Sequence, residues 1–508
     1  MATLPRLLAL FALLCLGLGD ALANNVRITN VTLPTEVNTA PGGGYTLDVS
    51  YDLSWDNSWR ISTGPANWDG VYIFGRYRVD EGPWRFLGDV GVATPTGFNK
   101  VGPSGQGQII YRDADGSGDV SLTGVQYLGL IPDPLFDPNA EIEVRLYATE
   151  MVWIPEGDFE LGQGGGIATN RFFYARVLAG GPAPWPVESE AAISVGVPDI
   201  NTPRFTIAQD AQRAGMDSGT IPAAYPKGHS GFWMMRYEVS QQQYVDFFNA
   251  LDETQRFYVD PTDASGKNGD AEVFRNGISY QVGSDATTTL PNVAMTYVRA
   301  SGMLAYLDWA GLRPMTEFEF AKAARGTRPA VEDEYAWGTT DIAVGDYTRI
   351  DAGTEDERYT TGFSSVAGNA LYGSTRGNAN GPGRVGAIAA SATNPSRILS
   401  GAGYYGVMDL SGNVYETAIS AGSATSRAFE DVRGDYEYDV SFFLGGGGFP
   451  ATWPDPSSES FAFRGGSWAG PAREQLVADR TWGLTRHTTA YSTVGFRGVV
   501  RADFDNVQ

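Results

Sequence analysis

A single cysteine, Cys15, in 508 residues constrains this chain more than any other feature of its sequence. Cys15 lies within an apolar run, residues 7–18, and Ala21-Leu22-Ala23 then places small residues two positions apart. This pattern is typical of a signal peptide, so we expect residues 1–23 to be removed and the mature chain to begin at Asn24. The mature protein would then contain no thiol.

A chain without a thiol can form no disulfide, no thiolate nucleophile and no cysteine metal site. Hydrophobic residues make up 42% of the sequence and charged residues 19%, so we expect a globular rather than a disordered chain. Because 508 residues exceed one ordinary core, we expect two domains.

The N-terminal pattern also predicts where the protein acts. We expect it to be secreted or held at the cell surface after cleavage near Ala23. The alternative is a lipoprotein attached through Cys15, which is disfavoured because Leu14 stands where a small residue is expected. No later stretch reaches the roughly 18 apolar residues of a membrane-spanning helix, so we expect no membrane insertion.

The net charge of the chain limits the classes of partner that it can bind. Asp and Glu number 59 against 36 Lys and Arg, which gives a formal net charge of −23. Nucleic acid and anionic membranes would be repelled over long range, so we expect neither as a partner. The same charge favours solubility and cation binding.

Residues 24–145 read as an all-β domain. Runs of β-branched and aromatic residues at 45–51, 71–77 and 142–147 are separated by Gly, Pro and Asn turns, and no capped helix lies between them. We expect a β-sandwich. Its tryptophans could form a sugar-stacking platform, although core anchors are the favoured interpretation; they are Trp55, Trp59, Trp68 and Trp84.

Three helices are predicted farther along the chain. Ser240 and Gln243 form a capping box ahead of an apolar stripe that ends at Leu251, and Thr316 and Glu319 form another ahead of a helix that ends at Gly326. Between them, Thr296 is expected to cap a helix that stops at Gly311.

A series of motifs begins at Met151-Val152-Trp153-Ile154-Pro155-Glu156-Gly157 and continues to the end of the chain. The further segments of the series are 232–240, 313–326, 335–338, 410–416, and Phe463-Arg464-Gly465-Gly466-Ser467-Trp468 with Gly495-Phe496-Arg497-Gly498. In this order the motifs resemble those of the formylglycine-generating enzyme family, also called the sulfatase-modifying-factor family.

This resemblance implies an α+β protein in which the all-β sandwich is followed, over residues 146–508, by a loop-rich domain related to the C-type lectin fold. We expect insertions near 253–290, 340–400 and 420–460, which are rich in small and polar residues. Such surface loops often carry specificity.

The family's oxidases bind copper through a pair of cysteines just after the Gly-Gly-Ser element, whereas this chain reads Ala469-Gly470-Pro471-Ala472-Arg473-Glu474-Gln475 there. A related branch holds iron through several histidines, but this chain has only His229 and His487. We therefore expect no copper and no iron, and an inactive scaffold. A hydrolase using two carboxylates stays open, because the distance between two side chains cannot be read from a sequence.

Calcium is the expected cofactor, in a structural role. Asp113, Asp115, Ser117 and Asp119 place oxygen ligands at alternate positions around glycines, as in the first half of an EF-hand loop. A solvated turn is an equal alternative. The resemblance adds Asn413 and Glu416 as ligands, while Gly403 replaces a further one.

The resemblance also points to a ligand-binding face at residues 469–494, which correspond to the active-site face of the oxidases. Trp468 and Phe496 are expected in the core, with Arg464 and Arg497 tying loops together. The residues expected to bind a ligand mix cations with aromatic rings: Arg473, Arg480, Trp482, Arg486, His487 and Tyr491.

These observations predict a non-catalytic protein of recognition or structure. It would serve adhesion, ligand capture or self-assembly into an extracellular layer or fibre, with an extracellular ligand, a surface glycan or its own copies as partner. The alternative is an enzyme of the same fold, with residual sulfatase-maturation activity or a carboxylate-based hydrolase mechanism.

Overall fold

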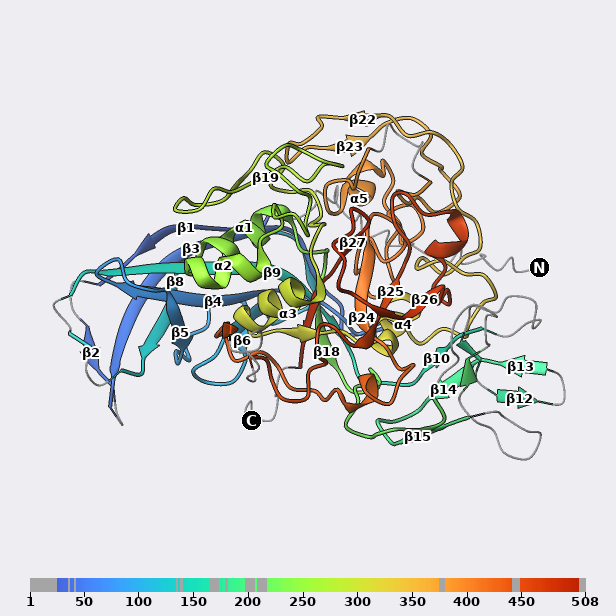
Figure 1. Ribbon diagram of the computed structural model, residues 1–508, viewed down its shortest axis with the longest axis horizontal. Helices are drawn as coiled ribbons and strands as arrows, with labels where there is room; N and C mark the ends of the chain where they lie inside the picture. The colour runs from blue at the N-terminus through green and yellow to red at the C-terminus, as the bar shows by residue number, and fades with distance from the viewer. Residues whose placement is uncertain are drawn as a thin grey trace, which may run out of the picture.

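The computed structural model describes residues 25–501 apart from several gaps, and the expected signal peptide lies outside them. The gaps are residues 35–36, 41–42, 134–135, 138–139, 164–172, 175, 179–180, 197–205, 208–216, 374–379 and 441–447. In Figure 1 the blue and cyan strands of the first third of the chain extend to the left, green and yellow helices lie over them, and most of the orange and red segments lie to the right.

A twelve-stranded sheet runs through both sides in the order β1-β3-β8-β5-β4-β9-β18-β28-β21, with β2 on β3, β7 on β4 and β6 on β7. Its strands are β1 (Arg27–Thr32), β2 (Asn38–Thr39), β3 (Tyr45–Arg60), β4 (Asp69–Val79), β5 (Arg85–Asp89), β6 (Phe98–Val101), β7 (Gln108–Arg112), β8 (Gly116–Ile131), β9 (Ile142–Ile154), β18 (Phe232–Met235), β21 (Arg313–Pro314) and β28 (Gly498–Val500).

The first strands form the predicted β-sandwich. Alternate residues of β3 from Leu47 to Trp55 are buried, as expected for a strand with one face on a core. They pack against Val71 and Ile73 of β4. Strand β5 joins the two layers, because Arg85 to Leu87 pair with β4 while Gly88 and Asp89 pair with β8.

The four tryptophans of this domain pack against other side chains of the protein. Trp55 is fully buried in the sandwich core, which confirms its role as an anchor. The other three are half-buried, and a guanidinium covers a face of each ring. Arg236 lies 4.8 Å from the Trp59 ring centroid, Arg60 lies 4.4 Å from Trp68, and Arg145 lies 4.4 Å from Trp84.

Strand β9 connects the sandwich to the rest of the molecule. Residues Ile142 to Val152 pair with β4, and Met151 to Ile154 pair with β18. The boundary expected between residues 145 and 146 therefore falls inside this strand, and the sheet continues through it.

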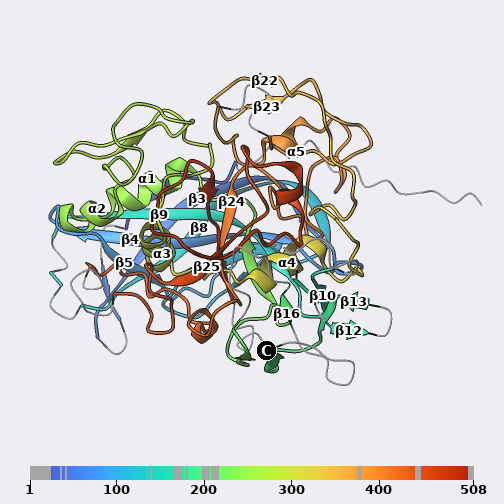
Figure 2. The same ribbon diagram turned by 45° about the vertical axis from the view of Figure 1, so that its right-hand side comes forward.

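Helices α1 (Gln241–Asn249) and α3 (Ala300–Trp309) cover the face of β4 and β9 that points away from the sandwich core (Figures 1 and 2). The Trp309 ring of α3 meets Phe74 of β4 and Tyr147 of β9 edge to face, at centroid distances of 5.0 and 4.9 Å. This aromatic contact joins the helical layer to the sheet.

The three predicted helices are present, but the N-terminal cap predicted for one of them is absent. The Ser240 capping box of α1 and the Thr316 capping box of α4 (Glu317–Arg325) are both confirmed. Helix α3 begins at Ala300 without a side-chain cap. Thr296 does not cap it, because Tyr297 takes a left-handed conformation with φ of 60° and interrupts the chain before the helix.

A four-stranded sheet contains strands from the segments in which the ligand-binding face is predicted. Its order is β26-β25-β24-β27, with β24 and β27 parallel. The strands are β24 (Tyr415–Ile419), β25 (Glu459–Arg464), β26 (Trp482–Arg486) and β27 (Val494–Gly495).

The remaining elements are short. Paired two-stranded sheets are β10 (Phe159–Leu161) with β14 (Trp185–Val187), β11 (Phe173–Tyr174) with β16 (Thr206–Ile207), β12 (Arg176–Leu178) with β13 (Gly181–Ala183), β15 (Ile193–Val195) with β17 (Gly219–Ile221), β19 (Ile278–Ser279) with β20 (Thr287–Thr288), and β22 (Arg349–Ile350) with β23 (Arg358–Tyr359). Short helices are α2 (Glu253–Val259), α5 (Ala387–Ser391), η2 (Ser426–Ala428) and η4 (Ala472–Gln475). No helix in the described part of the chain combines the length and apolar character needed to cross a membrane.

Candidate functional site

Two buried arginines organise the region around β24 to β28. Arg464 donates hydrogen bonds to the carbonyl oxygens of Asp479 and Val477, at 2.5 and 2.6 Å. Arg497 donates to the carbonyls of Met235, Arg236 and Met408 and also pairs with Glu416. Both guanidiniums thus donate to backbone carbonyls of several segments and tie these segments together, as predicted.

Trp468 and Gln475, at the two ends of the segment that follows the Gly-Gly-Ser element, pack inward. Trp468 is 5% exposed, and its indole N–H donates to the Ser492 carbonyl at 2.9 Å. Gln475 is fully buried, and its amide donates to the Ser467 carbonyl at 3.3 Å. A Cβ added to Gly466 would lie 2.2 Å from this amide nitrogen. The space beneath Ser467 is therefore filled by side chains.

Three of the six residues expected to bind a ligand are exposed. The side chains of Arg473 and Arg486 are 59% and 64% exposed, and Tyr491 is 40% exposed. Trp482 is half-buried. We call the exposed residues Arg473, Arg486 and Tyr491 the recognition face.

The other two residues are buried, which corrects their expected place on that face. Arg480 pairs with Glu317 of α4 through two contacts of 2.7 Å. This partner lies far away in the sequence, so the pairing could not be predicted from the local pattern. His487 is 2% exposed and packs edge to face on Phe463, at a centroid distance of 5.0 Å, and burial lowers its pKa to about 4.

Asn413 and Glu416 belong to a buried charged cluster. The Asn413 amide donates to Glu238 at 2.9 Å, and its oxygen accepts the backbone N–H of Gly383 at 2.8 Å. Burial and the nearby carboxylates of Asp409 and Glu416 raise the pKa of Glu238. Arg497 supplies the positive charge that Glu416 contacts. Asn413 and Oε1 of Glu416 thus already have protein partners, whereas the buried Oε2 of Glu416 has no hydrogen-bond partner among the described residues.

Gly403, where the resemblance implies a missing ligand, leaves no room for a side chain. A Cβ there would lie 2.7 Å from the Ala323 carbonyl oxygen and 3.0 Å from a methyl carbon of Leu410. Glycine is required by this close approach of two backbone segments. A substitution that restored the ligand would displace the loop.

The expected calcium loop lies at the start of β8. Asp115 accepts a hydrogen bond from the Ser62 hydroxyl at 2.7 Å, which lowers the pKa of Asp115, and Asp119 accepts the backbone N–H of Asn57 at 2.9 Å. Within the described residues, no three His, Cys, Asp or Glu side chains are grouped so that they could hold a metal ion. Asp113, Asp115 and Asp119 accordingly do not meet at one point, and calcium stays a prediction.

Comparison of the sequence with known protein families identifies the family of the chain. The model of the sulfatase-modifying factor enzyme 1-like domain matches residues 138–502. The chain belongs to this family. No curated protein matches it. For this sulfatase-modifying factor-like protein, the predicted combination of a β-sandwich and a loop-rich α+β domain is confirmed.

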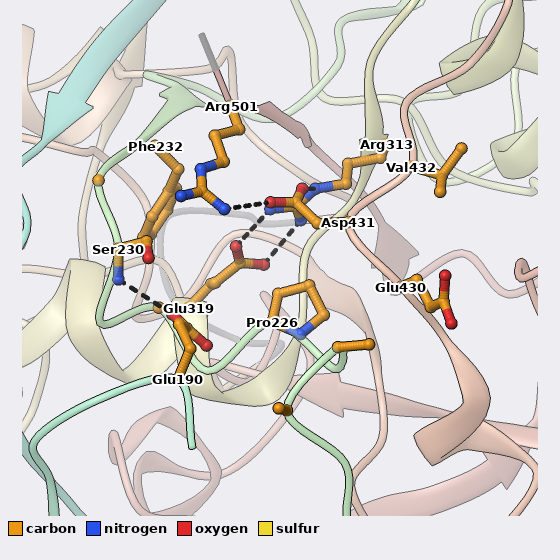
Figure 3. Close-up of a pocket in the computed structure, with 14 residues that line it drawn as sticks. Glu190, Pro226, Ser230, Phe232, Arg313, Glu319, Glu430, Asp431, Val432 and Arg501 are labelled. Carbon is orange, nitrogen blue, oxygen red and sulfur yellow. Dashed lines mark hydrogen bonds and ion pairs between the residues drawn. The ribbon is translucent and has the colours of Figure 1, made fainter. Parts of the chain in front are cut away.

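A cavity of about 310 Å³ lies beside helix α4 of the sulfatase-modifying factor-like domain, and Figure 3 shows its charged lining. Arg313 is held by both oxygens of Glu319, at 2.7 and 2.9 Å, and also contacts Asp431. Arg501 approaches the same Asp431 at 3.5 Å. Glu319 and Asp431 are thus paired with guanidiniums, and neither is placed as a free hydrolytic carboxylate.

A shallower cavity of about 530 Å³ adjoins the recognition face. Arg473 lines it together with Glu332, Asp333, Tyr335 and Thr340. The Tyr335 ring stacks on Trp337 at 4.8 Å, which fixes one wall. This hollow places an exposed cation beside carboxylates and an aromatic ring.

Proposed function

We propose that this protein is an exported, non-catalytic member of its family that works in recognition or in extracellular structure. The observation that carries the proposal is the filled space beneath Ser467. Gln475 and Trp468 occupy the segment in which the family's oxidases place copper-binding cysteines, and the only cysteine of the chain is Cys15. Copper chemistry through thiolates has no ligands there.

The recognition face supports a binding role. Arg473 and Arg486 offer exposed guanidiniums, and Tyr491 offers an aromatic ring, the residue types that binding sites favour. The cavity beside Arg473 gives this face a shallow hollow against which a ligand group can lie. The proposed partners are an extracellular ligand, a surface glycan, or further copies of the chain that assemble into a layer or fibre.

An oxidase assay tests the loss of catalysis. Purified residues 24–508 are incubated with copper and a cysteine-containing sulfatase peptide, and the peptide is followed by mass spectrometry. We expect no formylglycine. Conversion of the peptide above a copper-only control would contradict the proposal.

A binding screen tests the recognition role. Glycans and surface polymers are presented to the mature protein and to an Arg473→Ala/Tyr491→Ala variant, with Arg358→Ala as a control for an exposed arginine elsewhere. Binding that only the double substitution abolishes supports the recognition face. Light scattering over a range of concentrations detects assembly; a monomer that binds nothing in the screen would reject both roles.

Export and calcium are part of the proposal. The N-terminal sequence of the protein recovered outside the cell should start at Asn24. Calcium is proposed at Asp113, Asp115, Ser117 and Asp119, whose hard oxygens suit the ion, with the cluster of Asn413 and Glu416 as the second place. Added calcium should raise the Tm of the wild type, and Asp115→Asn/Asp119→Asn should remove that increase if the loop is the site.

A further inference from the structure

A buried amine and a buried carboxyl group meet inside the β-sandwich, at a place that no role proposed above uses. Nζ of Lys100, on β6, lies 2.5 Å from Oδ2 of Asp89, at the end of β5. The two side chains are 4% and 1% exposed. The other lysines of the chain, Lys227, Lys267 and Lys322, donate from Nζ to backbone carbonyls. In the described part of the chain, Lys100 is therefore the one lysine in contact with a carboxyl group.

This pair differs in its chemistry from the other buried ion pairs of the described residues. Those pairs, such as Arg497 with Glu416, use a guanidinium, which keeps its proton and cannot act as a nucleophile. A primary amine becomes a nucleophile once it has given up one proton. The contact between Lys100 and Asp89 can therefore lead to a covalent bond, whereas the arginine pairs cannot.

The surroundings of the pair favour the loss of both charges. Burial raises the pKa of Asp89, although Lys100 and the N–H of Gly91 oppose this shift. Burial and the charge of Asp89 together raise the pKa of Tyr51 and of Tyr127, which both belong to the hydrophobic core of the sandwich. A site of low polarity disfavours an ammonium and a carboxylate alike, so transfer of one proton between them yields two neutral groups.

Gly91 contacts both partners. Its N–H donates to Oδ1 of Asp89 at 2.8 Å, and its carbonyl oxygen accepts a hydrogen bond from Nζ of Lys100 at 3.1 Å. A Cβ on Gly91 would lie 3.1 Å from the same Oδ1. The backbone N–H is thus placed to stabilise negative charge that develops on Oδ1, and the carbonyl holds the amine beside the carboxyl group.

We propose that Lys100 and Asp89 condense to an intramolecular amide that links β6 to β5. A proton first passes from Nζ to Oδ2, which leaves an amine and a carboxylic acid. Nζ then forms a bond to Cγ, and the Gly91 N–H stabilises the charge on Oδ1. A second proton moves from Nζ to Oδ2, the bond between Cγ and Oδ2 breaks, and one water leaves. The step needs no co-reactant.

The amide would join parts of the sandwich that hydrogen bonds hold together only indirectly. Strand β5 belongs to both layers, whereas β6 pairs with β7 alone among the described strands. The chain has a single cysteine, Cys15, so no disulfide can form within one copy. An amide between side chains supplies a covalent link that does not depend on thiols.

Mass spectrometry of denatured, trypsin-digested protein (residues 24–508) tests the proposal. Trypsin cuts after Arg85, Lys100 and Arg112, and no other lysine or arginine lies between Arg85 and Arg112. An acylated Lys100 resists trypsin, so we expect one peptide, residues 86–112, lighter than its sequence mass by one water. Separate peptides 86–100 and 101–112 at full mass would overturn the proposal and show an ion pair and nothing more.

Two variants and one further mass pattern complete the test. Lys100→Arg keeps the positive charge without the nucleophile, so its peptides should retain full mass. Lys267→Arg, at a buried lysine without a carboxylate contact, is the control and should still yield the linked peptide. Loss of water from a peptide 86–100 that trypsin has released would instead indicate a cyclic imide at Asp89 and would also overturn the proposal. The wild-type digest decides the outcome even where a variant fails to fold, and it does so independently of any recognition role.

Discussion

The sandwich and the loop-rich half of this molecule bury their chains by different means. In the sandwich, β3 and β8 pair along nearly their whole length, and alternate side chains fill a hydrocarbon core. In the loop-rich half, fully buried arginines are among the largest side chains of the interior: Arg313, Arg325, Arg464 and Arg497. The difference teaches that guanidinium donors can satisfy buried carbonyls where strand ladders are short.

Removing one of these arginines should have the largest effect on stability. Arg497→Met leaves Glu416 and three backbone carbonyls buried without their donor, and we expect a loss of about 3–5 kcal/mol in the free energy of unfolding. Arg497→Lys keeps the charge without the fork and should recover only part of it. Denaturant unfolding measures both; a loss below about 1 kcal/mol for Arg497→Met would remove the contrast between the two halves.

A cavity created by substitution in the sandwich should lower the free energy of unfolding by less, about 3 kcal/mol. Leu47 is 1% exposed, and Leu47→Ala deletes buried methyl groups in the hydrocarbon core. Because β9 belongs to both halves, fluorescence and circular dichroism should report one shared unfolding transition. Val92→Ala, at a residue that is 94% exposed, is the control and should change nothing. Two separate transitions would show that the halves are energetically independent.

Acidification should weaken the loop-rich half through His487. Its pKa is lowered to about 4, so the folded protein binds fewer protons than the unfolded chain, and stability falls as the pH drops from about 6.5 to about 4. The limiting slope for one such group is about 1.36 kcal/mol per pH unit. The free energy of unfolding of His487→Gln should lack this loss between about pH 6.5 and pH 4. His229→Gln should show the same loss as the wild type. Identical profiles for the wild type and His487→Gln would contradict the assignment.

Exposed ion pairs should contribute least to the free energy of unfolding. Arg486 and Glu459 approach at 3.3 Å, but their side chains are 64% and 58% exposed. Solvent screens such pairs, so Arg486→Ala should change the free energy of unfolding by less than about 0.5 kcal/mol. A larger loss would mean that surface charge, and not only buried charge, stabilises this half.

Local patterns predicted local structure well. Ser240 with Gln243 and Thr316 with Glu319 both cap helices as their spacing indicates. The same signal was present at Asp252 and Gln255, which form the capping box of α2 inside the segment expected to be a loop-rich insertion. Only the cap expected at Thr296 failed, because the conformation of Tyr297 cannot be read from neighbouring residue types.

The site was harder to predict because its partners come from distant segments. Nothing near Arg480 in the sequence indicates that Glu317 will neutralise it, and nothing near His487 indicates that Phe463 will cover it. A periodic pattern describes one element, whereas burial and charge pairing depend on several.

Strand β9 decides how this molecule can be divided. The family match begins at residue 138, so a fragment designed on that boundary would take β9 with it and leave β4 behind. The fragment would then present the backbone of residues 142–152 as an open edge, and the discarded piece would present the complementary edge of β4. Both edges are templates for pairing with other chains, so the convenient cut is also the one most prone to aggregation.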